Sequence, residues 1–182
     1  SSFGMLGPTK LNHRLLDAFL ASPLAQQAHC QLVLVGENET GQYGAELQRK
    51  IASADCAASI RITGFVSADD YQHYLAASDV SVQLRTQTRG ETSASVLDCL
   101  LHGVPTIINA HGAAATLPDQ VLIKLPDLFD DAALSAALTE LYTTPQRRAA
   151  LAAAGRSHVQ QQHAPAAVGR QYHAAIEALT RN

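Results

Sequence analysis

The sequence lacks the features that mark disulfide-rich, membrane-spanning and nucleic-acid-binding chains. Its three cysteines, Cys30, Cys56 and Cys99, form no pair at metal-binding spacing and lie in or beside apolar segments, so we expect buried free thiols of a reducing compartment. No apolar run reaches the roughly 18 residues that a membrane span needs, and no signal-peptide pattern occurs. With a net charge of -3, the chain has no overall basic field that would favour nucleic acid.

Common nucleotide-binding and metal-binding signatures are missing too. Neither a Walker motif nor a G-x-G-x-x-G fingerprint occurs, which leaves little support for a nicotinamide-dependent dehydrogenase. Internal repeats are absent. Four histidines lie on or at the ends of predicted helices at spacings unrelated to a metal site: His102, His158, His163 and His173. We therefore expect neither a metal nor a cofactor.

What the sequence does contain is a regular alternation of short apolar runs and helical patterns. Six runs rich in Val, Ile and Leu are typical of strands covered on both faces: 2–6, 31–36, 59–65, 79–84, 105–109 and 121–125. The helical patterns occupy about 10–21, 43–54, 67–77, 93–102, 130–143, 145–162 and 165–180. This alternation predicts an α/β fold, with a doubly wound parallel sheet of about six strands in three layers and extra C-terminal helices.

The 182 residues, of which 47% are hydrophobic, suit a single domain over 1–182. The chain opens directly on a predicted strand, so we expect natural sequence upstream. Local signals mark several helix boundaries. Ser67 suits an N-cap, Thr144 is a capping residue ahead of a proline at a first helical position, and Gly103 suits a helix end.

Ligands of doubly wound sheets bind outside the carboxyl ends of the strands. The loops to inspect therefore follow the strands: 7–10, 36–42, 64–67, 85–92 and 110–116. In the first loop, Lys10 lies at a predicted helix start, where a cation is unfavourable for the helix dipole unless an anion is bound. A solvated lysine explains the same residue equally well.

The most polar strand end is "RTQTRGETSASVLD", residues 85–98. Arg85 and Arg89 offer planar forks to phosphates or carboxylates, and Ser93 opens a helix whose N–H groups suit a phosphate. Asp98 has apolar neighbours on both sides and needs a partner. The vicinal hydroxyls of a ribose would serve, and so would a nearby Arg or Lys.

Two other loops carry weaker signals. "GENETGQYG" contains glycines that let the backbone turn tightly and approach a ligand, yet such turns are common on protein surfaces. "NAHGAAA" places His111 and Gly112 within reach of a ligand, although an isolated loop histidine is more often only solvated.

Taken in order, four segments resemble the C-terminal donor-binding domain of retaining GT-B glycosyltransferases of family four: "SFGMLGPTK", "LVLVGENE", "IRITGFVSADDYQHYLAASDVSV" and "ETSASVLDCLLHGVPTI". The similarity covers nearly the whole chain, and the third segment, followed by an acid and "GVP", is its most specific part. The resemblance implies two Rossmann-like domains with a nucleotide sugar in the cleft between them. The domain that binds the acceptor would lie upstream of this chain.

The resemblance assigns roles to individual residues. Lys10 matches the lysine that contacts the donor diphosphate, and Asp98 matches the second acid of a Glu–seven residues–Glu pattern, which holds the ribose hydroxyls. Further matched positions are expected to line the donor site: Gly36 and Glu37 after the second strand, Phe65 and Val66 beside the base, and Thr92, Ser93 and Ala94 with N–H groups toward the diphosphate. Arg85 and Gly112 complete the predicted binding residues.

Three departures from the family pattern bear on function. The family's arginine beside the first strand aligns with Met5, so one of two usual diphosphate cations is missing, and an arginine of the 85–92 loop is the candidate substitute. The first acid, which touches the donor sugar, aligns with Gly90; we expect a one-residue shift of the loop to let Glu91 serve. The second acid is Asp98 rather than Glu, which shortens its reach by one methylene.

The leading hypothesis is transfer of a hexose, with retained configuration, from a nucleotide-diphosphate sugar to a glycan or lipid-linked acceptor. Without a metal, Lys10, Arg89 and the amides near Ser93 would stabilise the departing diphosphate. Glu91 would orient the sugar and Asp98 the ribose. This chain by itself is expected to bind donor weakly and to transfer little, because half of the cleft belongs to the upstream domain.

Two alternatives stay open. Met5 and Gly90 at normally charged positions favour a non-catalytic scaffold domain of the same fold. A sugar-nucleotide epimerase of the GT-B fold would instead use the strand-end site for elimination. The resemblance also implies a cytoplasmic protein. Peripheral attachment to the inner membrane face is common in such enzymes and resides mostly in the upstream domain. From the net charge, no nucleic-acid partner is expected.

The final helices are expected to pack on the sheet. In the resembled family the last helix also crosses back to the other domain. Part of its apolar face is therefore expected to be exposed where that domain is absent.

Overall fold

The computed structural model describes residues 1–180, in which six strands alternate with seven α-helices. The strands are β1 (Ser2–Phe3), β2 (Leu32–Val35), β3 (Ile60–Ile62), β4 (Ser81–Gln83), β5 (Thr106–Asn109) and β6 (Ile123–Leu125). The helices are α1 (Asn12–Ala21), α2 (Gln42–Ala52), α3 (Ala68–Ala76), α4 (Ala94–His102), α5 (Asp131–Thr143), α6 (Pro145–Gln162) and α7 (Pro165–Thr180). Two of the short 3-10 helices matter for the site: η1 (Pro8–Lys10) and η4 (Gly112–Thr116).

The strands form two parallel three-stranded sheets that meet edge to edge. β2 lies between β1 and β3, and β5 lies between β4 and β6. β1 and β4 adjoin, since the N–H of Val82 donates to the carbonyl of Ser1 at 2.8 Å. The spatial order is therefore β3-β2-β1-β4-β5-β6. This confirms the predicted doubly wound parallel arrangement and places its switch point between β1 and β4.

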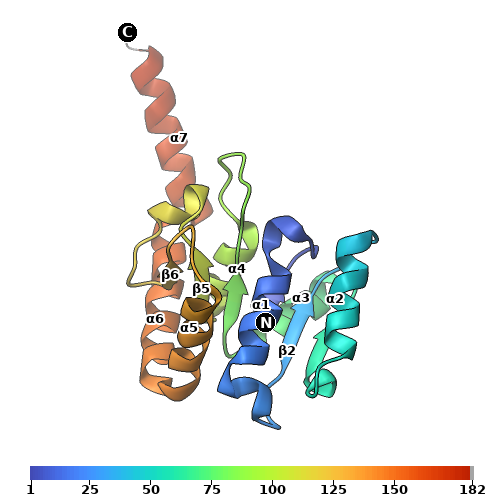
Figure 1. The fold of residues 1–182 in the computed structure, drawn as a ribbon. Helices are drawn as coiled ribbons and strands as arrows, with labels where there is room; N and C mark the ends of the chain where they lie inside the picture. The colour runs from blue at the N-terminus through green and yellow to red at the C-terminus, as the bar shows by residue number, and fades with distance from the viewer. Residues whose placement is uncertain (181–182) are drawn as a thin grey trace.

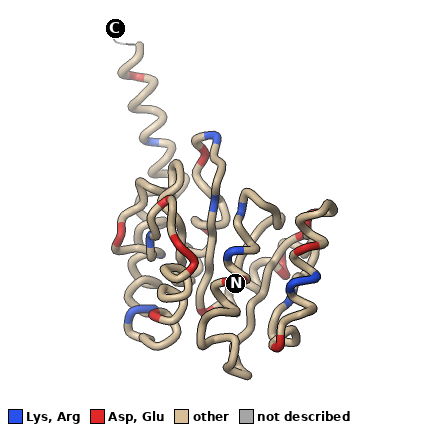
Figure 2. Tube along the Cα trace, in the orientation of Figure 1, with Lys and Arg blue, Asp and Glu red and all other residues tan. Residues whose placement is uncertain are grey.

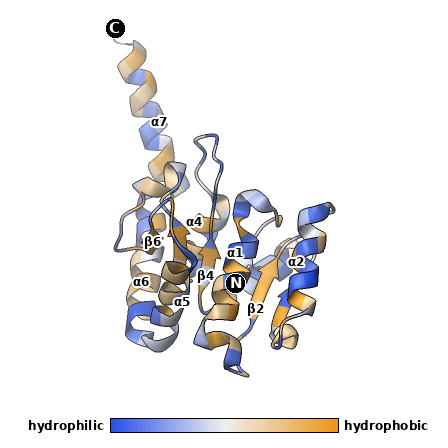
Figure 3. Cartoon of the chain, viewed as in Figure 1, coloured by the Kyte–Doolittle hydropathy of each residue, from blue (hydrophilic) through white to orange (hydrophobic). Residues whose placement is uncertain are grey.

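Helices cover both faces of the strands (Figure 1). Leu34 and Ile107 pack with α1, α2 and α5, whereas Val35 and Ile108 pack on the other side with α3, α4 and α6. Neighbouring residues of one strand point to opposite faces, so both must be apolar. This is why the strands are continuous apolar runs, which Figure 3 shows as orange segments in the centre of the domain.

Two boundaries after β1 differ from the prediction. The strand predicted over 2–6 ends at Phe3, because Gly4 takes a φ of +101°, outside the range of a strand. The helix predicted from residue 10 begins at Asn12, because Leu11, with a φ of 52°, separates it from η1. Lys10 therefore ends a 3-10 turn and does not start a helix.

The predicted helix caps hold in two cases out of three. The Ser67 hydroxyl accepts a hydrogen bond from the N–H of Asp70 at 3.1 Å, and Gly103 ends α4 with a φ of 70°. Pro145 does begin α6, but the Thr144 side chain makes no capping hydrogen bond. That part of the prediction is wrong, because the Thr144 backbone, at φ -122° and ψ 79°, lies outside the extended conformation usual for a cap.

The last two helices pack differently. α6 is anchored on α4, and an added Cβ at Gly155 would lie only 2.8 Å from Leu100. α7 has no buried residue and projects away from the domain (Figure 1). The prediction that it packs on the sheet is wrong, because α1 to α6 already cover both faces. Its Tyr172, Ile176 and Leu179 are exposed.

The cysteines match their prediction only in part. All three are free, but only Cys99 is buried, while Cys30 and Cys56 are half-buried. Burial raises the pKa of the Cys99 thiol to about 11, so the thiol stays protonated and donates to Ser81 Oγ at 3.2 Å. None of the helices within residues 1–180 combines the length and apolar character of a membrane span.

Candidate functional site

The candidate site lies at the switch point, above the carboxyl ends of β1 and β4. The loop after β4, residues 85–92, rises beside the turn that joins β1 to α1 (Figure 1). The two segments are joined where the N–H of Thr86 donates to the carbonyl of Thr9 at 2.9 Å. Figure 2 shows basic positions in both segments, and Figure 3 shows the 85–92 loop to be hydrophilic.

Lys10 points inward. Its Nζ donates to the carbonyl of Phe3 at 3.0 Å and lies over Gly4, where an added Cβ would come within 2.3 Å of Nζ. Burial, and secondarily the charge of Arg85, lowers the pKa of Lys10 from 10.5 to about 8. None of the ion pairs within residues 1–180 involves Lys10. A largely buried ammonium without an acidic partner is unfavourable, and it indicates a place prepared for an anion.

Arg85 brings a second cation to the same place. Its Nη2 donates to Ser93 Oγ at 3.0 Å. No ion pair within residues 1–180 includes it, although its charge is a minor cause of the lowered pKa of Glu91. The backbone of Arg85 is fixed by the buried Asn109, whose Oδ1 accepts from the Arg85 N–H at 2.8 Å and whose Nδ2 donates to the Arg85 carbonyl at 2.7 Å. Asn109 therefore sets the direction in which the chain leaves β4.

The start of α4 adds unpaired N–H groups. Ser93 is the N-cap, but its hydroxyl faces Arg85 and makes no capping bond. In the described structure no acceptor pairs with the three first-turn N–H groups, those of Ala94, Ser95 and Val96. A helix start of this kind attracts anions. We call Lys10, Arg85 and these three amides the anion cradle.

Arg89 and Glu91 lie at the exposed tip of the 85–92 loop. The Glu91 carboxylate accepts from the N–H of Arg89 at 2.7 Å and from Thr88 Oγ1 at 3.4 Å, so it caps its own turn. Hydrogen bonds from its own N–H and from that of Arg89 lower the pKa of Glu91. Gly90 takes a φ of +91°, which would strain an acid at that position. The sugar-binding role of Glu91 stays a prediction.

Asp98 pairs with a tyrosine. Its Oδ2 accepts from the hydroxyl of Tyr71 at 3.0 Å, and no ion pair within residues 1–180 includes it. The alternative of an Arg or Lys partner is therefore wrong. Burial, and then the charge of Asp98, raises the pKa of Tyr71, so the hydroxyl remains a donor. The second carboxylate oxygen has no protein partner, and ribose binding stays a prediction.

Four more predicted residues lie along the same edge, outside the cradle. An added Cβ at Gly36 would lie 2.2 Å from the carbonyl oxygen of Gly4, so this glycine allows the ends of β1 and β2 to approach. Glu37 is exposed. Phe65 is 86% exposed, whereas Val66 packs against the cluster around Phe3. Of the latter two, Phe65 is the side chain that is free to contact a base.

Loop 110–116 supplies a histidine that sequence reasoning underestimated. His111 is not simply solvated, because its Nδ1 lies 2.9 Å from Asp127 Oδ1. Gly112, with a φ of +58°, lies so close to Thr88 that an added Cβ would be 2.3 Å from Cγ2. No local pattern signals the pair, since Asp127 follows the next strand.

A hollow of about 790 Å³ opens between the 85–92 loop and the end of β5. It is lined by Thr9, Arg85, Thr86, Gln87, Thr88, Arg89, Glu91 and His111. The structure thus gathers Arg85, Arg89 and Glu91 in one hollow, while Lys10 and Asp98 lie outside its lining. Among residues 1–180, no three His, Cys, Asp or Glu side chains cluster as a metal site requires.

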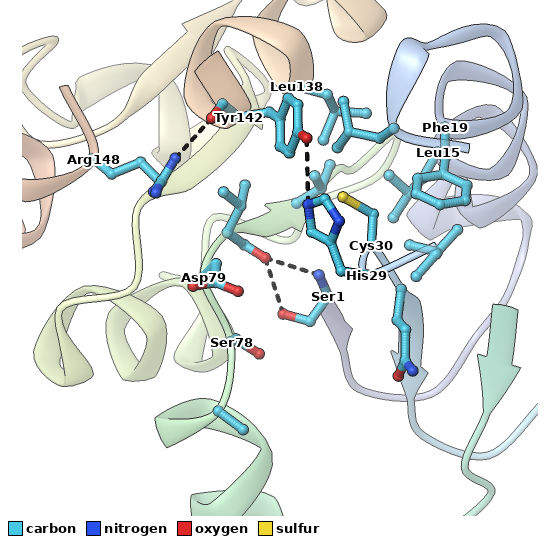
Figure 4. A pocket seen from close by; sticks show the side chains of 16 residues that line it. Ser1, Leu15, Phe19, His29, Cys30, Ser78, Asp79, Leu138, Tyr142 and Arg148 are labelled. Carbon is cyan, nitrogen blue, oxygen red and sulfur yellow. Dashed lines mark hydrogen bonds between the residues drawn. The ribbon is translucent and has the colours of Figure 1, made fainter. Parts of the chain in front are cut away.

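A second hollow, of about 480 Å³, lies at the amino ends of β1, β2 and β4 (Figure 4). Its polar side chains form hydrogen bonds between elements of the fold. The hydroxyl of Tyr142 lies 3.3 Å from Nε2 of His29, and Arg148 donates to the carbonyl of Tyr142 at the end of α5. None of the predicted site residues lines this hollow. The candidate site is therefore the carboxyl edge.

Two comparisons by sequence show what the chain is similar to. The model of the family "Glycosyl transferases group 1" matches residues 2–158. The chain is 30% identical over 160 residues to the GDP-mannose-dependent monoacylated alpha-(1-6)-phosphatidylinositol monomannoside mannosyltransferase of Corynebacterium glutamicum. That match covers 85% of this chain and 40% of the mannosyltransferase, so the chain spans less than half of this relative.

Solved structures share the fold. Anabaena Alr3699/HepE in complex with UDP superposes with a TM-score of 0.82 at 19% identity, over 97% of this chain and 48% of that one. The C-terminal domain of the group 1 glycosyl transferase LpcC from Francisella tularensis has a TM-score of 0.79 at 18% identity, over 90% of this chain and 85% of that one. Since the family match extends over nearly all of the strands and helices described above, the chain belongs to the glycosyl transferases group 1 family.

Proposed function

We propose that this chain is the donor-binding domain of a glycosyltransferase and that the anion cradle holds the diphosphate of a nucleotide sugar. The observation that carries the proposal is the inward-pointing ammonium of Lys10, which has no acidic partner and lies close to Arg85. A diphosphate would supply the missing negative charge through charge-assisted hydrogen bonds. The UDP complex of Alr3699/HepE and the GDP-mannose dependence of the relative support this ligand class.

The cradle also suits the chemistry of transfer. When the bond between the anomeric carbon and the diphosphate oxygen breaks, negative charge grows on the departing diphosphate. Lys10, Arg85 and the first amides of α4 would stabilise that charge more strongly than they stabilise the intact donor. We therefore propose that departure needs no metal ion.

Arg85 takes the place of the diphosphate cation that Met5 leaves missing. It lies close enough to Lys10 to lower the pKa of that lysine, and it contacts the N-cap of α4. Arg89 lies at the loop tip, so we assign it to the hollow and not to the diphosphate. We propose that Glu91 exchanges its contacts in the loop for the donor sugar, and that Asp98, oriented by Tyr71, binds the ribose.

For the whole protein, we propose transfer of a hexose with retained configuration. The acceptor would be a glycan or a lipid-linked molecule bound by the upstream domain. The mannosyltransferase relative acts on a phosphatidylinositol monomannoside, which supports a lipid-linked acceptor. We further propose a cytoplasmic protein that attaches peripherally to the inner face of a membrane.

Calorimetric titration with UDP, GDP and ADP tests the binding proposal. We expect at least one of them to bind. Its affinity should fall as pH rises above about 8, because Lys10 then loses the positive charge that attracts the diphosphate. The corresponding nucleosides are the control and should show neither measurable binding nor this pH dependence. Failure of all three diphosphates to bind at millimolar concentration would contradict the proposal and favour the scaffold alternative.

A further inference from the structure

His111 is held in one orientation at the wall of the hollow beside the cradle. Its Nδ1 lies 2.9 Å from Oδ1 and 3.1 Å from Oδ2 of Asp127. Only 22% of its side chain is exposed. A loop histidine held by a carboxylate and facing a hollow has fewer accessible rotamers than a solvated one, so less entropy is lost when it binds a ligand.

The Asp127 carboxylate is itself anchored to the cradle. Nδ2 of Asn109 donates to Asp127 Oδ1 at 3.1 Å, and Asn109 also holds both backbone groups of Arg85. Asn109 is 2% exposed, so the connection is anchored in the core, although the Asp127 side chain itself is 49% exposed. The chain of contacts from His111 through Asp127 and Asn109 to Arg85 fixes the imidazole relative to the proposed diphosphate site.

The opposite wall of the hollow brings Glu91 toward the same space. Thr88 packs on the backbone of Gly112, the residue after His111. Thr88 Oγ1 in turn accepts from the N–H of Gly90 at 3.0 Å and lies 3.4 Å from the Glu91 carboxylate. The turn that carries Glu91 is therefore seated on the loop that carries His111.

The hollow offers hydrogen-bond donors and acceptors together. The Asp127 carboxylate accepts a hydrogen bond from Asn109 as well, so in a neutral ring Nδ1 of His111 carries the proton and Nε2 is an acceptor. Glu91 is a second acceptor, while Arg85 and Arg89 are donors. A hydroxyl group both donates and accepts. A neutral ring with several hydroxyls can match this set, whereas an apolar or purely anionic ligand would leave acceptors unpaired.

We propose that His111, positioned by Asp127, binds a hydroxyl of the donor hexose in this hollow and so distinguishes the sugar nucleotide from the free nucleoside diphosphate. The inference rests on the proposed function of the neighbouring cradle. It assigns substrate contact to His111 and a positioning role to Asp127. It also accounts for a hydrogen-bond network that links β4, β5 and the segment after β6 at this edge.

The test compares UDP with UDP-glucose and GDP with GDP-mannose by calorimetry. We expect His111→Ala to weaken binding of the matching sugar nucleotide about tenfold and to leave the free diphosphate within about twofold. Asp127→Asn is expected to weaken the sugar nucleotide selectively as well. His111→Gln, whose amide oxygen also accepts, should recover most of the affinity. The exposed His73 provides the control, because His73→Ala should change neither ligand.

The outcomes separate this inference from the proposed function. Equal loss of both ligands in His111→Ala would show a structural or phosphate-binding role and overturn the inference. Unchanged binding of the sugar nucleotide would also overturn it, while the cradle would stand. A wild-type chain that binds no nucleotide would refute the proposed function, and the inference would fall with it.

Discussion

Replacing Lys10 by Met is expected to lower the affinity for a nucleoside diphosphate about 100-fold, which corresponds to about 2.7 kcal/mol. The methionine keeps most of the apolar stem but removes the charge that faces the ligand. The effect is large because the ammonium is shielded from water and already placed by its hydrogen bond to Phe3. Calorimetric titration of the two proteins measures the difference.

The same substitution should not lower the free energy of unfolding at neutral pH by more than about 0.5 kcal/mol. The pKa of Lys10 is lowered in the folded chain, so its protonated form opposes folding below about pH 8. This penalty is relieved as pH rises from about 8 toward the unfolded value of 10.5. Lys50→Met, at an exposed lysine paired with Asp17, is the control and should leave binding unchanged. Lost stability with unchanged binding in Lys10→Met would indicate a structural lysine and contradict the account.

Gly36→Ala is expected to lower the free energy of unfolding by about 3 kcal/mol, the upper end of the usual range for overpacking. The added Cβ would lie 2.2 Å from the carbonyl oxygen and 2.6 Å from the carbonyl carbon of Gly4. These are backbone atoms, so they cannot rotate away as a side chain would. Because Gly4 lies beneath the Lys10 ammonium, the variant should also bind diphosphate more weakly. Denaturant-induced unfolding measures the stability.

Gly7→Ala is the matched control for Gly36→Ala. Gly7 lies between β1 and η1, its backbone is extended at a φ of 176°, and nothing lies within 4 Å of an added Cβ. We expect its stability to stay within about 0.5 kcal/mol of the wild type. If both alanine variants unfolded at the same denaturant concentration, the close approach of β1 and β2 would not be essential to the fold.

The topology was predictable because it depends on local patterns. Pairs such as Leu34–Val35 and Ile107–Ile108 show that both faces of a strand are covered, which requires crossover helices and a parallel sheet. The positions of the candidate loops then follow from the rule for strand ends. The orientation of Lys10 could not be predicted in this way. The orientation depends on the φ of Gly4 and on the close approach between Gly4 and Gly36, which follows β2.

The partners of the polar side chains were likewise beyond local reasoning. Asp98 meets Tyr71 from α3, and His111 meets Asp127 from the segment after β6. Each pair joins residues far apart in the sequence, so no spacing rule identifies it. The exposure of α7 could not be predicted for a related reason. Its apolar residues suggested packing, but whether surface remains for a helix to cover depends on the whole fold.

The pKa of Lys10, followed by NMR of its side chain with and without a bound nucleoside diphosphate, tests the central claim most directly. The Lys10→Met variant assigns the resonance. We predict a pKa of about 8 in the free protein, because the ammonium is largely buried without an acidic partner, and a rise to at least the ordinary value of 10.5 when the diphosphate is bound. A pKa that stays at the same value when the nucleotide saturates the protein would contradict the assignment of Lys10 to the diphosphate.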